Sequence, residues 1–126
     1  MRPHVLVVDD DTLFAEAATA VLESDRRVEV VGRAADGREA LALAQALRPH
    51  VVLMDIHMPV MDGLEATRRL RASLPSARVV VVTSSPSADD RRAAREAGAH
   101  AFLAKELGTE ALVEAALSAG REAVSR

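Results

Sequence analysis

Short apolar runs alternate with longer amphipathic segments along the chain, and this alternation predicts its secondary structure. Five apolar runs predict strands: Val5–Val8, Val28–Val31, Val51–Met54, Val79–Val82 and Ala101–Ala104. Between and after them, apolar residues at helical spacing predict helices over 12–24, 36–47, 63–74, 86–97 and 109–123. Pro49, Pro75 and Gly98 give the stop signals for three of these helices.

The residue types within the strands predict how the strands are ordered in a parallel sheet. The first, third and fourth runs are apolar throughout, as in strands that are buried on both faces. The second run alternates (Arg27-Val28-Glu29-Val30) and the fifth is short and alanine-rich, which is typical of edge strands. A strand followed by a helix, five times, predicts an α/β fold, the (βα)5 flavodoxin-like doubly wound sheet with strand order 2-1-3-4-5.

The apolar stripes of the helices predict which residues pack on the sheet. We expect the first helix to bury Leu13, Ala17 and Val21, and the second and third to bury Ala40, Leu41, Ala44, Leu47, Ala66, Leu70 and Leu74. The fourth helix offers only alanines on its apolar side and carries three arginines elsewhere. Because so little apolar area holds it, this helix either opens locally at low cost or is an ordinary solvated helix rich in arginine, and the pattern favours neither.

Composition excludes several classes of protein. A chain of 126 residues fits one domain, and it has no cysteine for disulfides and no apolar run of transmembrane length. A net charge of −3 and only two aromatic residues, Phe14 and Phe102, argue against direct nucleic-acid binding. The N-terminus lacks the pattern of a secretory signal, so we expect a cytoplasmic protein without membrane contact.

Polar residues that suit phosphoryl chemistry follow four of the five strands. They are Asp9, Asp10, Asp11, Asp55, Thr83, Ser84 and Lys105, the only lysine among sixteen basic residues. Clustered carboxylates repel one another and suit Mg²⁺, while a lysine and a hydroxyl suit an anionic oxygen. A carboxylate can also attack a phosphoryl group. Each residue alone has an ordinary role, such as helix capping by Asp11, but their convergence on one sheet edge favours a functional site.

These residues resemble the receiver domain of two-component response regulators. Val5 to Asp10 is similar to the acidic-pair strand of that family, and Thr83, Phe102 and Lys105 match its hydroxyl, aromatic and lysine positions. The most specific match is the signature Asp55-Ile56-His57-Met58-Pro59-Val60-Met61-Asp62-Gly63. The resemblance extends from Val5 to about Ser118.

The resemblance implies a role for each of these residues. Asp55 would accept a phosphoryl group from a sensor histidine kinase. Mg²⁺ would be bound by Asp10, Asp55 and the backbone carbonyl of His57, and by Asp9 through water. Thr83, Ser84, Lys105 and Phe102 would form the phosphate-binding and switch set. The face built from the fourth helix, fifth strand and fifth helix would then change its affinity for an output, without enzymatic activity beyond self-catalysed phosphotransfer and autodephosphorylation.

Departures from the common family pattern point to a subfamily. Lys105-Glu106, and Ala119-Gly120-Arg121 near the end, are similar to receivers that precede a LuxR-type helix-turn-helix domain. We therefore expect residues 1–126 to be a single receiver domain. Any DNA contact would be made through a C-terminal domain absent from this chain, and activation could produce a homodimer.

Alternative functions stay open at this point. One is a single-domain phosphorelay receiver, and another is an atypical interaction module. The third is a phosphohydrolase with an Asp nucleophile, similar to haloacid dehalogenases, although Leu13 breaks the Asp-x-Asp-x-Thr/Val pattern of that family. At the opposite sheet edge, His4, His50 and His100 each precede a strand. They indicate either a Zn²⁺ site or ordinary boundary residues, and the second is favoured.

Overall fold

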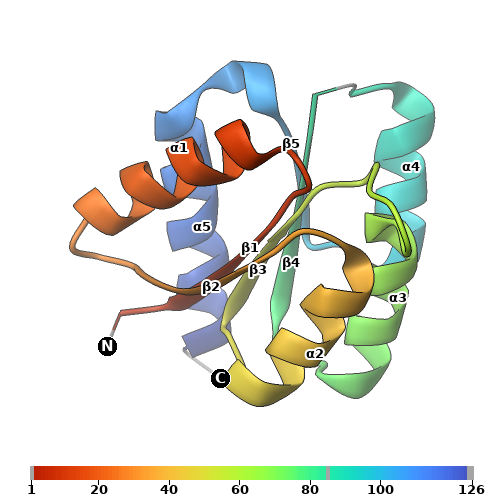
Figure 1. Cartoon of the computed structure of the whole chain (residues 1–126), viewed down its shortest axis with the longest axis horizontal. Helices are drawn as coiled ribbons and strands as arrows, with labels where there is room; N and C mark the ends of the chain where they lie inside the picture. Colours follow the sequence, from red (N-terminus) through yellow and green to blue (C-terminus); the bar gives the residue numbers. More distant parts are fainter. Residues whose placement is uncertain (1, 85, 125–126) are drawn as a thin grey trace.

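The computed structural model describes residues 2–84 and 86–124, and a five-stranded parallel sheet lies at its centre (Figure 1). Its strands are β1 (His4–Val8), β2 (Glu29–Ala34), β3 (Val51–Met54), β4 (Arg78–Thr83) and β5 (Ala101–Ala104). They lie in the order β2-β1-β3-β4-β5, which confirms the predicted flavodoxin-like topology. The carboxyl ends of all five strands therefore meet at one edge of the sheet.

Helices cover both faces of the sheet (Figure 1). One face carries α1 (Thr12–Ser24) and α5 (Thr109–Val124), and the other carries α2 (Gly37–Leu47), α3 (Gly63–Ser73) and α4 (Ala88–Ala97). A short 3₁₀ helix, η1 (Lys105–Leu107), connects β5 to α5 and was not predicted, because three residues show no periodicity. Among the described residues, no helix is both long and apolar enough to cross a membrane.

Side-chain caps set the helix starts more sharply than periodicity does. Asp36 accepts a hydrogen bond from the backbone N–H of Glu39 (2.8 Å), and Ser87 accepts one from Asp90 (2.9 Å). Both residues therefore stand before their helices, so α2 and α4 begin one and two residues later than predicted. The strand β2 lies over Glu29–Ala34, shifted toward the C-terminus from the predicted run.

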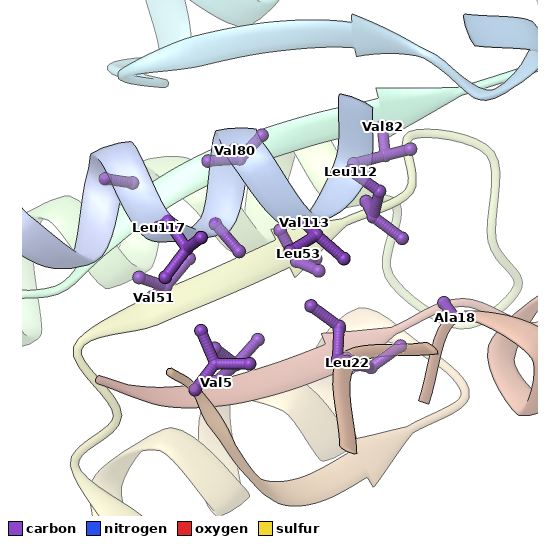
Figure 2. Packing of buried hydrophobic residues seen from close by; sticks show 14 of the residues in the cluster. Val5, Ala18, Leu22, Val51, Leu53, Val80, Val82, Leu112, Val113 and Leu117 are labelled. Atoms are coloured by element: carbon purple, nitrogen blue, oxygen red, sulfur yellow. The ribbon is translucent and has the colours of Figure 1, made fainter. Parts of the chain in front are cut away.

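The hydrophobic core consists of two clusters, one on each face of the sheet, because alternate residues of each strand point to opposite faces. Figure 2 shows the cluster under α1 and α5. There, Val5, Val51 and Val80 from three neighbouring strands pack with residues such as Leu22 and Leu117. The other cluster includes Leu6, Val52, Met54, Leu70 and Leu74.

The predicted stripe on α1 is wrong. Leu13 is 79% exposed, Ala17 is exposed and Val21 is only partly buried, whereas the buried residues are Ala15, Ala18 and Leu22. Apolar residues cover more than one side of this helix, so periodicity alone could not choose between them. The side that packs is the one that meets α5 and the sheet.

The other predicted stripes are confirmed in most positions. Leu41 and Leu47 of α2 are exceptions, because Leu41 is only partly buried and 38% of Leu47 is exposed at the end of the helix. Ala66, Leu70 and Leu74 are buried as predicted, and so are Ala94 and Ala97 of α4.

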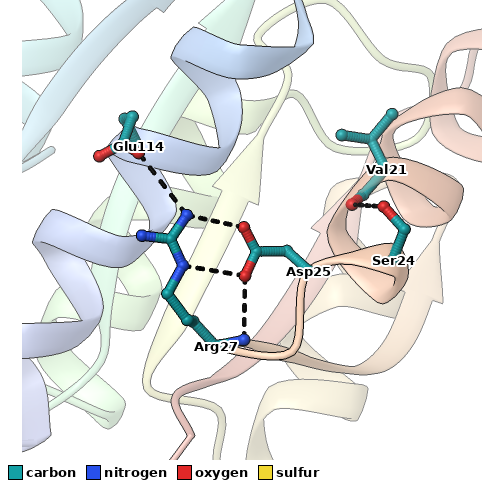
Figure 3. Close-up of polar contacts among 5 residues, drawn as sticks. All are labelled: Val21, Ser24, Asp25, Arg27 and Glu114. Atoms are coloured by element: carbon teal, nitrogen blue, oxygen red, sulfur yellow. Dashed lines mark hydrogen bonds and ion pairs between the residues drawn. The ribbon is translucent and has the colours of Figure 1, made fainter.

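A polar network ties the turn between α1 and β2 to α5 (Figure 3). The Arg27 guanidinium donates to both carboxylate oxygens of Asp25, at 3.0 and 2.8 Å, and lies 3.7 Å from Oε1 of Glu114. Hydrogen bonds from Arg27 lower the pKa of Asp25 to about 2. Because these groups are solvated, the network orients the turn more than it stabilises the fold.

The corrected face of α1 makes a testable prediction about stability. Leu22→Ala should lower the free energy of unfolding by about 3 kcal/mol, because Leu22 is fully buried and its truncation leaves a cavity. Leu13→Ala on the same helix is the matched control, with an expected change of less than about 0.5 kcal/mol. Urea unfolding measures both, and equal losses would contradict this assignment.

Candidate functional site

Three carboxylates meet at the carboxyl ends of β1 and β3. Asp9, Asp10 and Asp55 each place one carboxylate oxygen within 4.8 Å of the other two. The parallel ladder produces this proximity, because the backbone N–H of Asp55 donates to the carbonyl of Val8 at 3.0 Å. Asp9 and Asp55 are buried, whereas Asp10 is exposed. Two carboxylates of the cluster are therefore buried, and the third is exposed to solvent.

Lys105 supplies a positive charge to this cluster. Its Nζ lies 2.7 Å from Oδ2 of Asp9 and 3.9 Å from Oδ1 of Asp55, so Asp9 is its closer partner. The same Nζ lies 4.3 Å from the centre of the Phe14 ring, which is within range of a cation–π interaction. The side chain is only 13% exposed, so aromatic and carboxylate groups replace most of its hydration.

The charges of the site do not balance. Three carboxylates face a single ammonium, and burial raises the pKa of Asp55 to about 6, with a further contribution from the charge of Asp9. Lys105 acts in the opposite direction but does not cancel these effects. A divalent cation would remove the excess negative charge, and oxygen donors of this kind suit Mg²⁺. The residues present therefore fit a magnesium site.

The loop after Asp55 is held tightly. The backbone N–H of Gly63 donates to the carbonyl of Ile56 at 2.8 Å, and any Cβ at Gly63 would overlap the carbonyl oxygen of Asp55. Within the loop, Val60 has φ of 69°, and the N–H of Met61 donates to the carbonyl of Pro59 across it at 2.7 Å. A β-branched residue is strained in this conformation, so the surrounding contacts must hold the loop in place.

The remaining predicted residues lie around the cluster in different environments. Thr83 is fully buried at the end of β4, the strand beside β3, whereas Ser84 is exposed. The half-buried Phe102 ring lies under the guanidinium of Arg91 on α4, at 4.7 Å. His57 is exposed, and its Nε2 lies 3.8 Å from Oδ2 of Asp90, also on α4.

Sequence reasoning missed three contributors to this region. Phe14 packs against Lys105, while Asp90 and Arg91 connect α4 to His57 and Phe102. Nothing in the sequence pattern signals these contacts, because they join residues on separate elements. The expected cap is confirmed, since Asp11 accepts hydrogen bonds from the N–H groups of Leu13 and Phe14.

The three histidines lie at the opposite edge of the sheet. The Nδ1 atoms of His50 and His100 accept backbone N–H groups from the neighbouring strands, at 2.8 and 3.0 Å. Across residues 2–84 and 86–124, Asp9, Asp10 and Asp55 form the only group of three or more side chains placed to share a metal ion. These contacts favour boundary residues over a Zn²⁺ site.

Comparison with known proteins identifies the family. The sequence matches the response regulator receiver domain over residues 5–117. The chain belongs to this family. Receiver domains are phosphorylatable modules of two-component systems and bind Mg²⁺ at an acidic pocket, which agrees with the aspartate cluster described above.

Individual relatives agree in fold and differ in their named activities. GacA of Pseudomonas aeruginosa, a response regulator, is 43% identical over 111 residues, which are 88% of this chain and 52% of GacA. A protein-glutamate methylesterase/protein-glutamine glutaminase of Halalkalibacterium halodurans is 42% identical over 108 residues, 85% of this chain and 31% of that protein. The receiver domain of NarL from Mycobacterium tuberculosis superposes with a TM-score of 0.91 and 35% identity, covering 95% of this chain and 97% of that one.

The chain spans between about a third and a half of the length of these two curated relatives. They carry different named activities at similar identity. The comparisons therefore identify the receiver family and do not single out one subfamily or one output.

The raised pKa of Asp55 predicts how stability depends on pH. A carboxyl whose pKa is higher in the folded state than in the unfolded chain stabilises the fold at low pH, and this contribution is lost as pH rises from about 4 to about 6. Asp55→Asn removes the repelled charge. Without Mg²⁺ at pH 7.5 it should raise the free energy of unfolding by about 1 kcal/mol, a value reduced for solvent screening.

Urea unfolding at pH 4.5 and 7.5, with EDTA and then with Mg²⁺, measures this effect. The advantage of Asp55→Asn should shrink at pH 4.5, and Mg²⁺ should stabilise the wild type more than the variant. The exposed Glu23→Gln is the control for loss of one negative charge. An advantage of the same size at both pH values would contradict the assignment.

Proposed function

We propose that this domain is a phosphorylation switch in which Asp55 accepts a phosphoryl group from the phosphohistidine of a sensor kinase. The observation that carries the proposal is the meeting of Asp9, Asp10, Asp55 and Lys105 at one sheet edge. This set combines a nucleophile, the donors for a divalent cation and a cation for the transferred group. Ordinary surface residues have no reason to assemble in this way.

Asp55 is the better nucleophile of the two buried carboxylates. Both oxygens of Asp9 are engaged, Oδ1 by the N–H of Asp11 at 2.9 Å and Oδ2 by Lys105 at 2.7 Å. The shortest ion pair of Asp55 is the 3.9 Å contact with Lys105. Besides this contact, Asp55 receives a backbone hydrogen bond from Ile56, so it has no ion pair as short as that of Asp9. It is therefore the carboxylate better placed for in-line attack on phosphorus, with the histidine of the donor as leaving group.

The other residues of the site would hold the charges of this reaction. Asp10, Asp55 and the backbone carbonyl of His57 would bind Mg²⁺, with Asp9 acting through water, and the ion would neutralise phosphoryl oxygens. Lys105 would shift from Asp9 toward the new phosphate, and Thr83 and Ser84 would donate to it from the end of β4. Such fixed charges stabilise the transferring group in a partly water-excluded site.

The conformational change would be transmitted from the phosphorylation site through Phe102 to α4. Movement of Thr83 toward the phosphate would open space behind it for the Phe102 ring on the neighbouring strand β5, where Phe102 pairs with Val81. The ring would leave the Arg91 guanidinium and thereby change the surface of α4, β5 and α5. Because α4 buries only Ala94 and Ala97 fully, it is the helix with the least packing to lose.

The output is most consistent with transcription control. Lys105-Glu106 and Ala119-Gly120-Arg121 support a receiver of the LuxR-type subfamily, and the match to NarL supports it further. In that case the natural protein continues into a DNA-binding domain, works in the cytoplasm and forms a homodimer when phosphorylated. A single-domain phosphorelay receiver would use the same site without that domain.

A phosphohydrolase with Asp9 as nucleophile is the second candidate, because Lys105 lies closer to Asp9 than to Asp55. The engagement of both Asp9 oxygens argues against it. The signature from Asp55 to Gly63 also has no purpose in that reaction.

Phosphorylation should depend on Asp55. Incubation with Mg²⁺ and acetyl phosphate should add the mass of one phosphoryl group to the wild type and none to Asp55→Asn, and removal of Mg²⁺ should abolish the gain. Asp9→Asn should slow labelling at least about tenfold, through lost metal and Lys105 contacts. Intact mass spectrometry over time measures all of these.

Asp11→Asn is the matched control for this experiment, because asparagine caps a helix as well as aspartate does and Asp11 lies outside the cluster. It should label at the wild-type rate. A label that requires Asp9 as the attachment point and ignores Asp55 would establish the phosphohydrolase instead.

Phosphorylation should also loosen or re-form α4. We expect amide hydrogen exchange of residues 88–97 to change by at least about threefold on phosphorylation, while α2, which packs mainly on α3, β2 and β1, keeps its protection. Asp55→Asn treated with the same phosphodonor serves as the control. Equal protection of α4 in both states would remove this part of the proposal.

A further inference from the structure

Two histidines make the same contact at the N-terminal edge of the sheet. The backbone N–H of His50 donates to the carbonyl of His4 at 2.9 Å, and its ring Nδ1 accepts the N–H of His4 at 2.8 Å. His100 does the same with Val79, at 2.8 and 3.0 Å. Each histidine thus binds both polar backbone groups of one residue on the next strand. We call this two-bond contact a histidine clasp.

The clasp requires a neutral ring. A backbone N–H can only donate, so the Nδ1 atom that accepts it carries no proton, and the neutral ring holds its proton on Nε2. A protonated imidazole has N–H groups at both nitrogens and can accept at neither. Protonation would therefore place two donors face to face and leave a partly buried amide without its acceptor.

We propose that the clasps of His50 and His100 make this sheet edge proton-sensitive, so that protonation of either ring opens its clasp and detaches the start of β3 or β5 from the neighbouring strand. The inference rests on the hydrogen bonds alone. It does not depend on the phosphorylation site at the opposite edge.

The surroundings of the His50 clasp disfavour a charged ring. The ring of His50 lies 5.2 Å from that of His4, edge to face, and burial together with the charge of His4 lowers the pKa of His50. Among the described residues, the charged groups near the two clasps include Arg2, Glu29, Arg48, Arg78, Arg91, Arg95 and Glu122, together with Arg71 of α3, whose side chain packs against Gly98. Both acidic members of this set have basic partners, since Arg2 pairs with Glu29 at 2.8 Å and Arg78 with Glu122 at 4.0 Å.

The His50 clasp also positions the end of α5. Pro3 precedes His4, and a Cβ on Gly120 of α5 would overlap the Pro3 ring. The carbonyl of Pro3 in turn accepts the N–H of Glu29 at 2.9 Å. Loss of the His50 clasp would release the backbone around His4. Pro3, against which the last turns of α5 pack, would then be held less firmly. Protonation of His50 at the sheet edge would thus weaken the packing of the C-terminal helix α5.

The sign of the effect follows from linkage. The unfolded chain binds a proton on histidine below about pH 6.5, whereas a clasped ring resists protonation. The unfolded state therefore holds more protons in this range, and stability falls as pH decreases. For one ring that stays neutral in the fold, the unfolding equilibrium constant rises up to about tenfold between pH 7.5 and 5.5.

His50→Asn and His50→Leu separate the clasp from a purely steric role. The Oδ1 of asparagine occupies the position of the histidine Nδ1 and accepts the amide, but it does not titrate in this range. Leucine removes the acceptor at every pH. Urea unfolding at pH 7.5 and 5.5 in EDTA would be measured for the wild type, both variants and His50→Asn/His100→Asn. His57→Asn, which removes an exposed histidine outside the clasps, is the control.

We expect the wild-type unfolding constant to rise at least about threefold more than that of His50→Asn between the two pH values, with a flatter profile still in the double variant. His57→Asn should follow the wild type. His50→Leu should be less stable than His50→Asn at pH 7.5 or fail to fold, and either result supports the clasp.

Two results would overturn the proposal. One is the same pH dependence in the wild type and the double variant. The other is a nitrogen NMR spectrum at pH 7.5 in which Nδ1 of His50 carries the proton.

Discussion

The parallel hydrogen bonding between β1 and β3 is the constraint on which the site depends. Val8 of β1 pairs with Met54 of β3, and the next amide along, that of Asp55, donates to the carbonyl of Val8. This register places the residues after both strands side by side. A shift by one residue would reverse the sides of the sheet for every β3 side chain and separate Asp55 from Asp9. The shift would also exchange Val51 and Leu53 with Val52 and Met54 between the two core clusters, and the different packing of these side chains on each face opposes it.

The site then concentrates charge of one sign where water is scarce. Buried carboxylates repel each other, and one lysine reduces the repulsion without removing it. A bound divalent cation would relieve this repulsion. A new phosphoryl group would restore the excess negative charge and draw Lys105 and neighbouring donors toward it. In the proposed switch this imbalance would drive the change, and α4, which buries only Ala94 and Ala97, would be the element best able to respond.

Strand order and the chemical cluster could be predicted from the sequence, because both follow from patterns that are local in the chain. Apolar runs that suit burial on both faces indicate central strands. The polar residues that directly follow such parallel strands must meet at one edge of the sheet. The buried side of α1 could not be predicted, since apolar residues lie on more than one of its sides and only α5 selects among them. The same holds for Phe14 against Lys105 and Arg91 over Phe102, which join separate elements.

The single lysine also gives the domain one side chain that can react with amine reagents. Every other basic side chain is arginine or histidine, so Lys105 carries the only side-chain amine, and the bond after it is the only one open to a protease specific for lysine. That bond lies in η1, and its cleavage would separate all five strands from α5. With the ammonium 2.7 Å from Asp9 and largely buried, neither a protease nor an amine reagent can engage it in the closed site. The rate of covalent labelling or proteolytic cleavage at Lys105 would therefore measure the rate at which the site opens.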